Sequence, residues 1–484
     1  MLSRTRFRHT IRMPAISRRP ARMTAAVAGA AAVTLLAACS SSGSSPAAAG
    51  GTSSSPAAGT SASASASASA TVLAGGKSCS SSATPVMFWA WVPGISRAVT
   101  EFNKTHPTIC VTLEDPGAGG AEYTLLNNAM KAGSGAPDVA EMEFDELPSF
   151  IIQKYVVNLV PYGANNYKSD FASWAWSQVS QNGAVYAMPS DFGPMAFYYD
   201  QQTLAKYHIT PPTTWAEVAS DAVKLHQANS SAYLLNLSPN DLQWLMDMMG
   251  QAGAWPFQYS GGSNVTINWT GPAQEKFAAY WQDLINEHAV STVNDAGTEV
   301  NTNLDKGVTA AAIFSAWAPS YFVADVKQSM GQWRAAPLPQ WTAGASVGAD
   351  WGGSTYPVFT QSKHPAQAAE FSEWLTSTLT SWNIVKTPPS SLFPTFLPTL
   401  NSGSFKSLTY PVSGTSQPNQ VFSAGATGIA ATPWPPFMTQ ALTQANTTFG
   451  GVLTGKETMQ QAFAAFQTAE VSYAKAQGFT VSTG

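Results

Sequence analysis

The first residues that could do chemistry are a serine and its flanking glycines. Gly344-Ala345-Ser346-Val347-Gly348 matches G-x-S-x-G, the pattern in which a serine on a sharp strand-to-helix turn acts as the nucleophile of acyl transfer. Here the pattern lies in TAGASVGADWGG, a run of small residues that leads into a strand, with no helical pattern behind it. Since serine and glycine are abundant in this chain, we interpret the match as chance and do not expect a hydrolase.

Other catalytic patterns are weaker still. The six histidines show no H-E-x-x-H spacing, and the chain has neither a P-loop nor a dinucleotide-binding glycine pattern, so we expect no metal and no cofactor. Asp145 and Glu146 could in principle serve a glycosidase, which needs two carboxyl groups across a cleft. Neighbouring residues at the end of a strand point apart, so this pair is not such a site. No catalytic pattern in the sequence therefore supports an enzyme, and any other pairing of carboxyl groups is left unconstrained.

Aromatic side chains give a stronger signal. They make up 11% of the chain, with 16 tryptophans, and several fall at the ends of predicted strands, where an α/β sheet places its ligands. Their flat apolar faces and polar edges suit a pyranose ring, which presents C–H patches on one face and hydroxyls around its rim. Some tryptophans fall in helical patterns instead, and we assign these to packing: Trp174, Trp176, Trp281, Trp374 and Trp382.

The elements that would position such a site begin with a β-α-β unit. TPVMFWAWV (84–92) and TICVTLED (108–115) are short apolar runs typical of strands, and ISRAVTEFNKTHP (95–107) between them has apolar residues at helical spacing. A second helical pattern (121–135) and a third strand, PDVAEMEF (137–144), follow. This order predicts a parallel sheet. The folded part has about 400 residues, more than one core usually serves, so we expect two lobes.

The N-terminus has the pattern of an export signal. A basic stretch and a short apolar run lead to LAAC, which ends at Cys39 and resembles the bacterial lipobox, where the signal is cut before a cysteine that receives a diacylglycerol. Residues 1–38 are therefore the predicted signal peptide and Cys39 the predicted lipidated residue. An ordinary alanine-rich cleavage site is the alternative. The pair Arg18-Arg19 leaves open whether export follows the general secretory or the twin-arginine route.

After the lipidated cysteine, residues 39–83 consist mostly of Ser, Ala, Gly and Thr. Such a segment cannot offset the entropy of ordering, so we predict a disordered linker with a reach on the order of 35 Å. With Cys39 assigned to lipid, Cys79 and Cys110 remain as an even pair in an exported chain. A disulfide between them is expected, and two free thiols are the alternative.

The charge content excludes some partners. Charged residues make up 11% of the chain, the formal net charge is −4, and no basic stripe occurs in the predicted mature part. Nucleic acid is therefore not an expected partner. No second apolar run approaches the length that a membrane span requires.

Several segments together resemble the extracellular solute-binding proteins of ATP-binding cassette importers, in particular the sugar-binding family that includes maltose-binding protein. Each segment is weak alone, but the ordered set is specific and spans most of residues 84–470. The set comprises the lipobox, VMFWAW with FNKTHPTICVTLED, GSGAPDVAEMEFDELPSF, GAVYAMPSDFGPMAFYYDQQTL, PPTTWAEV, LDKGVTAAAIFSAW and WGGSTYPVFTQSKHPAQAAEFSEWL.

The resemblance implies a two-lobed periplasmic-binding-protein fold of the α/β class, with a ligand cleft between the lobes and several crossings of the chain. We expect crossings near residues 189–194, 352–356 and 393–398. The expected lobes are 84–190 plus 354–394 and 191–353 plus 395–484. The implied protein is a monomer, lipid-anchored on the extracellular face, that captures a carbohydrate, in particular an oligosaccharide, and delivers it to the membrane permease of an importer.

The resemblance also implies ligand contacts. Asp145 would contact sugar hydroxyls, Trp317 would be a stacking platform from the second lobe, Trp91 would lie at the cleft mouth, and Asp191 would accept from a hydroxyl. Further contacts are expected at Asn240, Asp241, Trp244, Trp351, Gly352, Gly353, Trp434 and Phe437. The chain departs from the family at Glu146, where some members carry a cation, and this leaves the identity of the ligand open.

Three other readings stay open at this point. The same scaffold could bind a polyamine, a phosphate ester or a glycerol conjugate. A polyamine would need several carboxylates around the aromatics, and a phosphate would need a basic or helix-terminal cluster. A glycan-acting enzyme would need a well-placed carboxylate pair, and a surface adhesin or sensor would use the fold without a permease.

Overall fold

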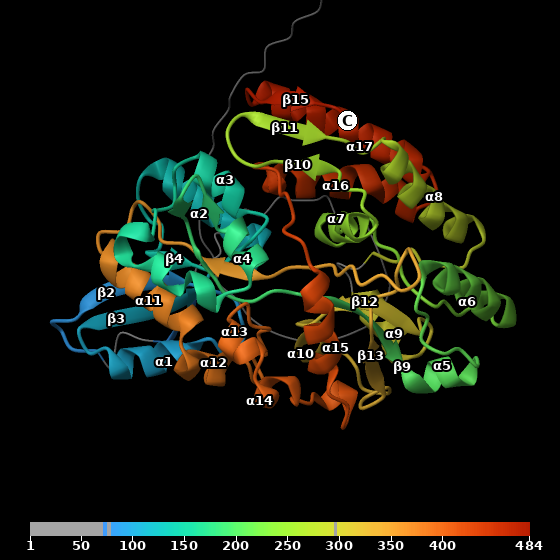
Figure 1. Cartoon of the computed structure of the whole chain (residues 1–484), viewed down its shortest axis with the longest axis horizontal. Helices are drawn as coiled ribbons and strands as arrows, with labels where there is room; N and C mark the ends of the chain where they lie inside the picture. The colour runs from blue at the N-terminus through green and yellow to red at the C-terminus, as the bar shows by residue number, and fades with distance from the viewer. Residues whose placement is uncertain (1–70, 75–78, 295–297) are drawn as a thin grey trace, which may run out of the picture. The chain divides into compact units, whose positions relative to one another are not determined.

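The computed structural model of this chain describes residues 71–74, 79–294 and 298–484 (Figure 1). The predicted signal peptide (1–38), Cys39 and most of the predicted linker lie outside the described residues. Thr71–Ala74, which lies within the segment predicted to be a disordered linker, forms strand β1. The reason is that β3 (Ile109–Asp115) offers a free edge, with which this short segment pairs antiparallel.

The first sheet region contains the predicted β-α-β unit. Its strands lie in the order β1-β3-β2-β4, and β2 (Thr84–Trp89) pairs parallel with both β3 and β4 (Val139–Ala140). The parallel pairing follows from the two helical connections, α1 (Ser96–Thr105) and α2 (Gly120–Ala132), as the sequence predicts.

Aromatic packing joins this sheet to a helix from much later in the chain. The rings of Phe88 on β2 and Phe102 on α1 each lie 5.0 Å, centroid to centroid, from Phe371 on α11 (Pro365–Ser377). All three side chains are buried. The first sheet region is therefore built from two separate stretches of chain. Its remaining elements are α3 (Leu147–Ile152), η1 (Val160–Tyr162), η2 (Ala164–Asp170), α4 (Ser173–Gln178), β6 (Ser180–Gln181), β7 (Ala184–Val185) and α12 (Leu379–Val385).

The second sheet region is centred on β9 (Met195–Asp200). β12 (Ala311–Ser315) and β13 (Trp333–Ala336) pair antiparallel with its two edges. Its helices before β13 are α5 (Gln201–Lys206), α6 (Trp215–Ala228), α7 (Leu242–Gln251), α8 (Pro272–Asn286), α9 (Thr298–Asp305) and α10 (Ala318–Phe322). Two long helices, α16 (Met438–Leu453) and α17 (Met459–Ala476), complete the region together with a small sheet of β10 (Phe257–Gln258), β11 (Asn264–Ile267) and β15 (Thr480–Ser482).

Several short helices follow α12 in the chain. They are α13 (Leu397–Leu400), α14 (Gly403–Lys406), η3 (Pro411–Ser413), α15 (Pro418–Gly425) and η4 (Ala426–Gly428). Phe393, Phe405 and Phe422 pack with Phe192 in a separate small core beneath them.

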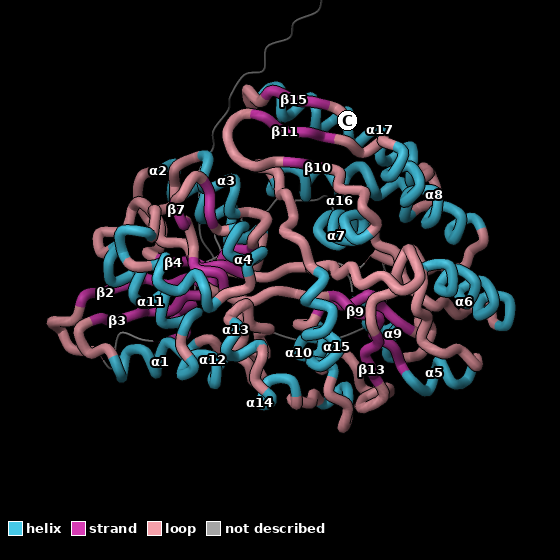
Figure 2. The backbone as a smooth tube through the Cα atoms, viewed as in Figure 1, coloured by secondary structure: helices cyan, strands magenta, loops and turns pink. Residues whose placement is uncertain are grey.

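Three extended segments connect the two sheet regions and lie side by side, at the positions expected for crossings. Isolated bridges pair Asp191 with Pro394 and Pro194 with Asp350. Figure 2 draws these connections as loops between the strands of the two regions. A third sheet, in the order β5-β14-β8, lies at the start of the connections and comprises β5 (Met142–Glu143), β14 (Ser354–Tyr356) and β8 (Met188–Pro189).

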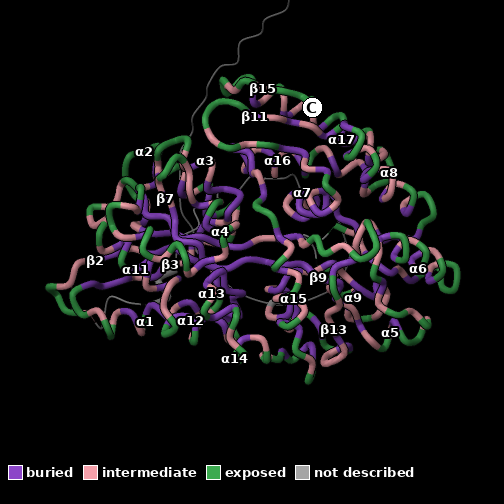
Figure 3. The backbone as a smooth tube through the Cα atoms, viewed as in Figure 1, coloured by how far each residue is buried: buried purple, intermediate pink, exposed green. Residues whose placement is uncertain are grey.

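Gly353 allows the crossings to approach so closely. Its φ is +105°, and an added Cβ would lie 2.8 Å from the Cα of Phe192 and 2.9 Å from the carbonyl oxygen of Asp191. Any side chain here would therefore push the first two crossings apart. Most residues of the crossings are buried, and Figure 3 shows much buried backbone, in purple, between the two sheet regions.

None of the helices in the described ranges combines the length and the apolar character that a membrane span requires.

The predicted disulfide is confirmed, since Cys79 and Cys110 are joined. The bridge ties the segment before β2 to β3, and the two cysteines are 31 residues apart. In the chain-entropy model, a loop of this size restricts the unfolded chain enough to contribute about 3–4 kcal/mol.

We predict that Cys79→Ser with Cys110→Ser lowers the free energy of unfolding by about 3 kcal/mol, because the unfolded chain regains loop freedom. Urea unfolding of the two proteins measures the difference. Peptide mapping without reductant should recover the two cysteines of the native exported protein as one linked pair, and two freely alkylated thiols there would contradict the assignment.

Candidate ligand-binding site

Four of the residues expected at the site line one cavity of about 440 Å³: Asn240, Asp241, Trp317 and Trp351. Its lining combines aromatic rings with amide and carboxylate side chains. The other lining residues, which were not predicted from the sequence, are Val300, Asn301, Phe314, Ala318, Phe322, Asp325, Leu442 and Asn446. All twelve lie within 191–353 or 395–484, the segments expected to form the second lobe.

Two tryptophans form the aromatic wall. Trp317 follows the end of β12, and Trp351 lies on the second crossing. Their ring centroids are 4.8 Å apart at an angle of 60°, and the indole Nε1–H of Trp317 donates to the carbonyl oxygen of Trp351 at 2.8 Å. This bond fixes the orientation of the Trp317 ring. Gly352 leaves room for it, since an added Cβ there would lie 3.2 Å from Trp317 Nε1.

Side-chain amides form much of the polar lining of the cavity. Asn240 accepts from Ser238 Oγ at 2.8 Å through its Oδ1, and its Nδ2 donates to Asn446 Oδ1 on α16 at 3.2 Å. Elsewhere in the lining, Asn301 Nδ2 donates to Asp325 Oδ2 at 2.7 Å. These bonds hold the side chains in place before a ligand arrives, so little rotamer entropy remains to be lost on binding.

Asp145 lies where the first sheet region contacts the second. It follows β5, is buried, and accepts a hydrogen bond at 2.6 Å from Nε2 of Gln243 on α7. Glu146 makes a parallel link, accepting at 2.8 Å from Oγ1 of Thr439 on α16. Neither Gln243 nor Thr439 is among the residues predicted from the sequence, although Gln243 lies between the expected contacts Asn240 and Trp244.

A group of buried carboxyl groups surrounds this contact. Burial raises the pKa of Asp145, and the nearby charge of Glu146 adds to the shift. Burial likewise raises the pKa of Glu143 to about 8 and that of Asp191 to about 7. Among the described residues, ion pairs occur on the surface between Lys104 and Glu101 and between Lys224 and Asp221, so none neutralises this group.

Several expected site residues lie outside the 440 Å³ cavity. Trp91 is half-buried beside Tyr123, with ring centroids 6.2 Å apart. Trp244 is buried, and its Nε1 donates to the carbonyl oxygen of Ile313 at 3.2 Å. Asp191 accepts from the backbone N–H of Ser354 at 3.2 Å, within the crossings.

The last two expected aromatics line other cavities. Phe437 lines one of about 740 Å³ between α2, α3 and the helices α16 and α17. Trp434 lines another, of about 370 Å³, with Phe144 and Tyr259. The structure therefore distributes the twelve expected ligand contacts over several places and brings four of them together.

The structure offers no support for the catalytic patterns. Ser346 lies in a loop, without the strand before it and the helix after it that a nucleophile turn requires. Within the described ranges, no group of three or more His, Cys, Asp or Glu side chains could hold a metal ion. The lining of the 440 Å³ cavity instead consists of aromatic rings, aliphatic side chains, side-chain amides and two carboxylates.

The crossings contain a carboxyl group suited to a pH test. Asp350 is buried and accepts from the backbone N–H of Gly193 at 2.7 Å. Burial raises its pKa to about 8, and the neighbouring charge of Asp191 adds to the shift. Since the folded chain then holds a proton that the unfolded chain has lost, stability from this group falls as pH rises from about 4 to about 8.

We predict that Asp350→Asn flattens this dependence, because the amide oxygen still accepts from Gly193 and carries no charge at any pH. The free energy of unfolding of the variant, relative to that of the native protein, should therefore rise by at least about 1.4 kcal/mol between about pH 5 and about pH 8. This is the equivalent of one pKa unit. Urea unfolding at both pH values measures this. Asp283→Asn, at an exposed position on α8, is the control, and equal pH dependence in the native and Asp350→Asn proteins would contradict the prediction.

Known proteins share this architecture. A binding protein associated with an ABC transporter of Bifidobacterium animalis subsp. lactis, solved with β-1,6-galactobiose, is 29% identical, with a TM-score of 0.73 over 82% of this chain and 99% of that one. The galacto-N-biose-/lacto-N-biose I-binding protein of Bifidobacterium longum is 23% identical, with a TM-score of 0.71 over 83% of this chain and 100% of that one. The chain thus has the two-lobed α/β fold of periplasmic binding proteins.

Sequence comparison gives the same result. An arabinooligosaccharide-binding protein of Bacillus subtilis is 23% identical over 307 residues, which cover 61% of this chain and 69% of that protein. A lactose-binding protein of Rhizobium radiobacter is 23% identical over 309 residues, covering 61% and 71%. The family model of the bacterial extracellular solute-binding proteins matches residues 91–378, more than half of the chain. The chain therefore belongs to the family of bacterial extracellular solute-binding proteins.

Proposed function

We propose that this protein captures a carbohydrate, in particular an oligosaccharide, and delivers it to the permease of an ATP-binding cassette importer. The observation that carries the proposal is the 440 Å³ cavity, with the Trp317 and Trp351 rings on one side and amide side chains at its rim. A cavity of this size holds one or two sugar rings, since small-ligand sites measure about 300–1,000 Å³.

The cavity matches the surface of a sugar. The C–H face of a pyranose can stack on an indole, and its hydroxyls can exchange hydrogen bonds with Asn240, Asn301 and Asn446. Amides both donate and accept, so they suit hydroxyls, which do the same. Asp241 and Asp325 add two acceptors that bond more strongly because they are charged.

The relatives support the choice of solute class. The names of two of them give arabinooligosaccharides and lactose as what they bind, and the two solved structures described above hold β-1,6-galactobiose and lacto-N-biose. We infer the same class for this chain, and the sugar itself is to be found by screening.

We propose that the lobes are 84–190 plus 354–394 and 191–353 plus 395–484, and that they close over the sugar. Asp145 with Gln243 and Glu146 with Thr439 would then be the contacts that form on closure. A ligand favours closure by the difference between its affinities for the closed and open states. We assign Asp145 and the remaining expected contacts to the closed form.

The anchoring proposal rests on the N-terminal sequence. Cleavage before Cys39 and acylation of its thiol would leave two acyl chains in the outer leaflet, which give stable membrane residence where one chain gives only marginal binding. The linker would hold a monomeric domain away from the membrane while leaving it within reach of the permease.

A polyamine is the second candidate solute, because Asp241 and Asp325 both line the cavity beside aromatic rings. A thermal-shift screen of the domain against sugars, sugar phosphates and polyamines separates the candidates, since a ligand that binds only the native state raises the melting temperature.

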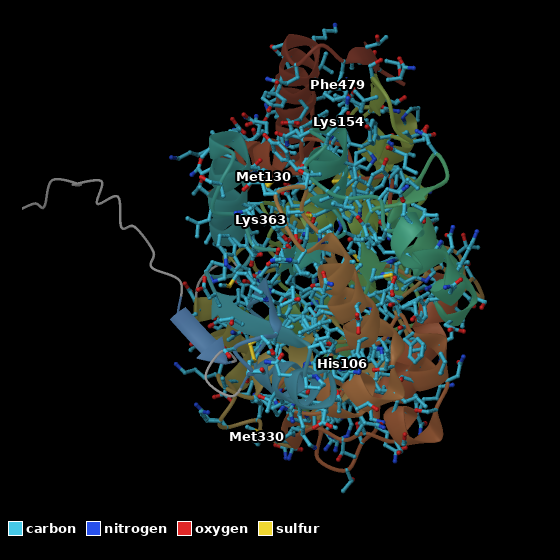
Figure 4. The ribbon with its side chains drawn as sticks, turned by 90° about the vertical axis from the view of Figure 1, so that its left-hand side faces the viewer. His106, Met130, Lys154, Met330, Lys363 and Phe479 are labelled. Atoms are coloured by element: carbon cyan, nitrogen blue, oxygen red, sulfur yellow. A yellow bond between two sulfur atoms is a disulfide. The ribbon has the colours of Figure 1, made fainter. Side chains whose placement is uncertain are left out.

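We predict that Trp317→Ala weakens binding of the sugar found in the screen by about tenfold or more, because the indole face is lost. Calorimetric titration measures the affinity. Trp374→Ala is a matched control, since Trp374 is half-buried on α11 and packs edge-on against His106, on the side of the chain that Figure 4 shows. Equal affinity in the native and Trp317→Ala proteins would exclude this cavity as the sugar site.

We predict that Cys39→Ser moves the protein from the membrane fraction to the soluble fraction and leaves sugar affinity unchanged, because only the acylated residue is altered. Fractionation and intact-mass measurement test this. A Cys39→Ser protein that stays in the membrane fraction without acyl mass would show that another segment holds it there.

A further inference from the structure

A small cavity of about 40 Å³ lies within the proposed second lobe. It is lined by α7 and by Trp255 just after it, by residues 347–350 at the start of the second crossing, and by residues of the segment 428–432. All of these residues lie within 191–353 or 395–484, and none of them is an expected ligand contact or lines the 440 Å³ cavity. The cavity is therefore internal to one proposed lobe and separate from the proposed sugar site.

Two buried carboxyl groups line this cavity. They belong to Asp247 on α7 and to Asp350, whose exposed fractions are 1% and 6%. Asp247 Oδ1 accepts from Thr432 Oγ1 at 3.1 Å, and Asp350 Oδ1 accepts from the backbone N–H of Gly193 at 2.7 Å. Oδ2 of Asp247 has no hydrogen-bond partner among the described residues. Because polar atoms buried this deeply are nearly always bonded, this oxygen points to an occupant of the cavity that can bind it.

The charges around the two carboxyl groups are of one sign. No Lys, Arg or His is among the residues that line the cavity. Burial raises the pKa of Asp247, and the nearby charge of Asp350 adds to the shift. The further charges that act on this pair, those of Asp145, Asp241 and Asp191, are also negative. A buried carboxylate in such surroundings is strongly unfavourable unless a proton or a cation neutralises it, and one divalent cation would neutralise both.

The rest of the lining suits a cation that binds oxygen ligands. Thr432 Oγ1 uses its proton in the bond to Asp247 and keeps lone pairs for a cation. The segments 347–350 and 428–432 are rich in Gly and Ala, whose small side chains leave the backbone carbonyl groups accessible. Ca²⁺ takes about six to eight oxygen ligands from carboxylates, carbonyls, hydroxyls and water. Because the cavity has two carboxyl groups, carbonyl groups and water would supply the other ligands.

The size of the cavity favours Ca²⁺ over Mg²⁺. A volume of about 40 Å³ holds about three water-sized particles, since each needs roughly 10–15 Å³. One Ca²⁺ ion with one or two water molecules therefore fits. Mg²⁺ usually keeps several of its water molecules, which this volume does not hold.

We propose that this cavity is a calcium-binding site, in which Asp247 and Asp350 are the charged ligands and Thr432 supplies a hydroxyl. The ion would join α7 to the segments that end at Asp350 and at Thr432. Since Asp350 directly precedes Trp351, the ion would also hold the segment that carries one ring of the aromatic wall. The sequence gives no sign of such a site, because its ligands come from three separate segments.

The test compares the melting temperature of the purified protein in EDTA and in millimolar Ca²⁺, at about pH 8 so that protons compete weakly for the carboxyl groups. In the native protein, Ca²⁺ should raise the melting temperature by about 3 °C or more, because the ion binds only the folded state. In Asp247→Asn and in Asp350→Asn, the rise should fall below about 1 °C. Calorimetric titration with Ca²⁺ should give an affinity at least about tenfold weaker in each variant.

Stability in EDTA shows whether the two substitutions act only through the ion. Each amide oxygen can still accept the hydrogen bond that the carboxyl group accepts now, and each substitution removes a buried acidic group. Neither variant should therefore melt at a lower temperature than the native protein in EDTA. Glu143→Gln is the matched control, because burial also raises the pKa of Glu143 to about 8 and this residue does not line the cavity. Its response to Ca²⁺ should equal that of the native protein.

Three outcomes would show that the proposal is wrong. The first is a native protein whose melting temperature Ca²⁺ does not raise. The second is a rise that persists in both Asp247→Asn and Asp350→Asn, or one that Glu143→Gln abolishes, since the ion would then bind elsewhere. The third is an equal rise with Mg²⁺, which the volume of the cavity excludes. No sugar is needed for this test, so its result does not depend on the proposed function.

Discussion

The rest of the structure depends on the close packing of three extended crossings. Their backbones bond to one another, from Phe192 N–H to the carbonyl oxygen of Phe393 at 3.0 Å and from Trp351 N–H to that of Gly193 at 2.8 Å. Gly353 makes this spacing sterically allowed. The same segments carry Trp351 and lie beside the end of β12, which presents Trp317. Because the crossings fix these positions, the aromatic wall of the cavity is a product of the connections and not of either sheet alone.

The contact between the two sheet regions is made by carboxyl groups that have neutral hydrogen-bond partners. Asp145 and Glu146 are buried and hydrogen-bonded to neutral partners, and burial favours the protonated form of each. One oxygen of each carboxyl group has no partner among the described residues. Such groups give directional hydrogen bonds without a strong ionic attraction, so the contact can form and break at modest cost.

The sequence predicts the fold better than the site. Alternation of apolar runs with helical spacing is a local signal, and it identifies β2, α1, β3 and α2 correctly. Trp317, Trp351, Asn240 and Asp241 could be found because each lies at a strand end, a crossing or a helix start. Asn446 could not, since a polar residue in the middle of α16 has the same sequence signal whether it faces solvent or a cavity. Tyr259 and Ser260 line a cavity together with β6, which lies about 80 residues earlier in the chain. Local sequence patterns carry no information about contacts between segments so far apart.

The position of the 440 Å³ cavity within one proposed lobe would affect the rates at which a ligand binds and dissociates. All residues that line the 440 Å³ cavity come from the proposed second lobe. A ligand could therefore bind to these residues before the proposed first lobe closes over it. In the proposed mechanism, association would then be governed by diffusion to an open surface, and closure through the hydrogen bond between Asp145 and Gln243 would act afterwards on the residence time. Substitutions of Trp317 or Trp351 would then alter the affinity of the first, open complex. Substitutions of Asp145 or Gln243 would alter the rate at which the ligand dissociates from the closed complex. A receptor built in this way can sample solutes quickly and hold the chosen one long enough to hand it on.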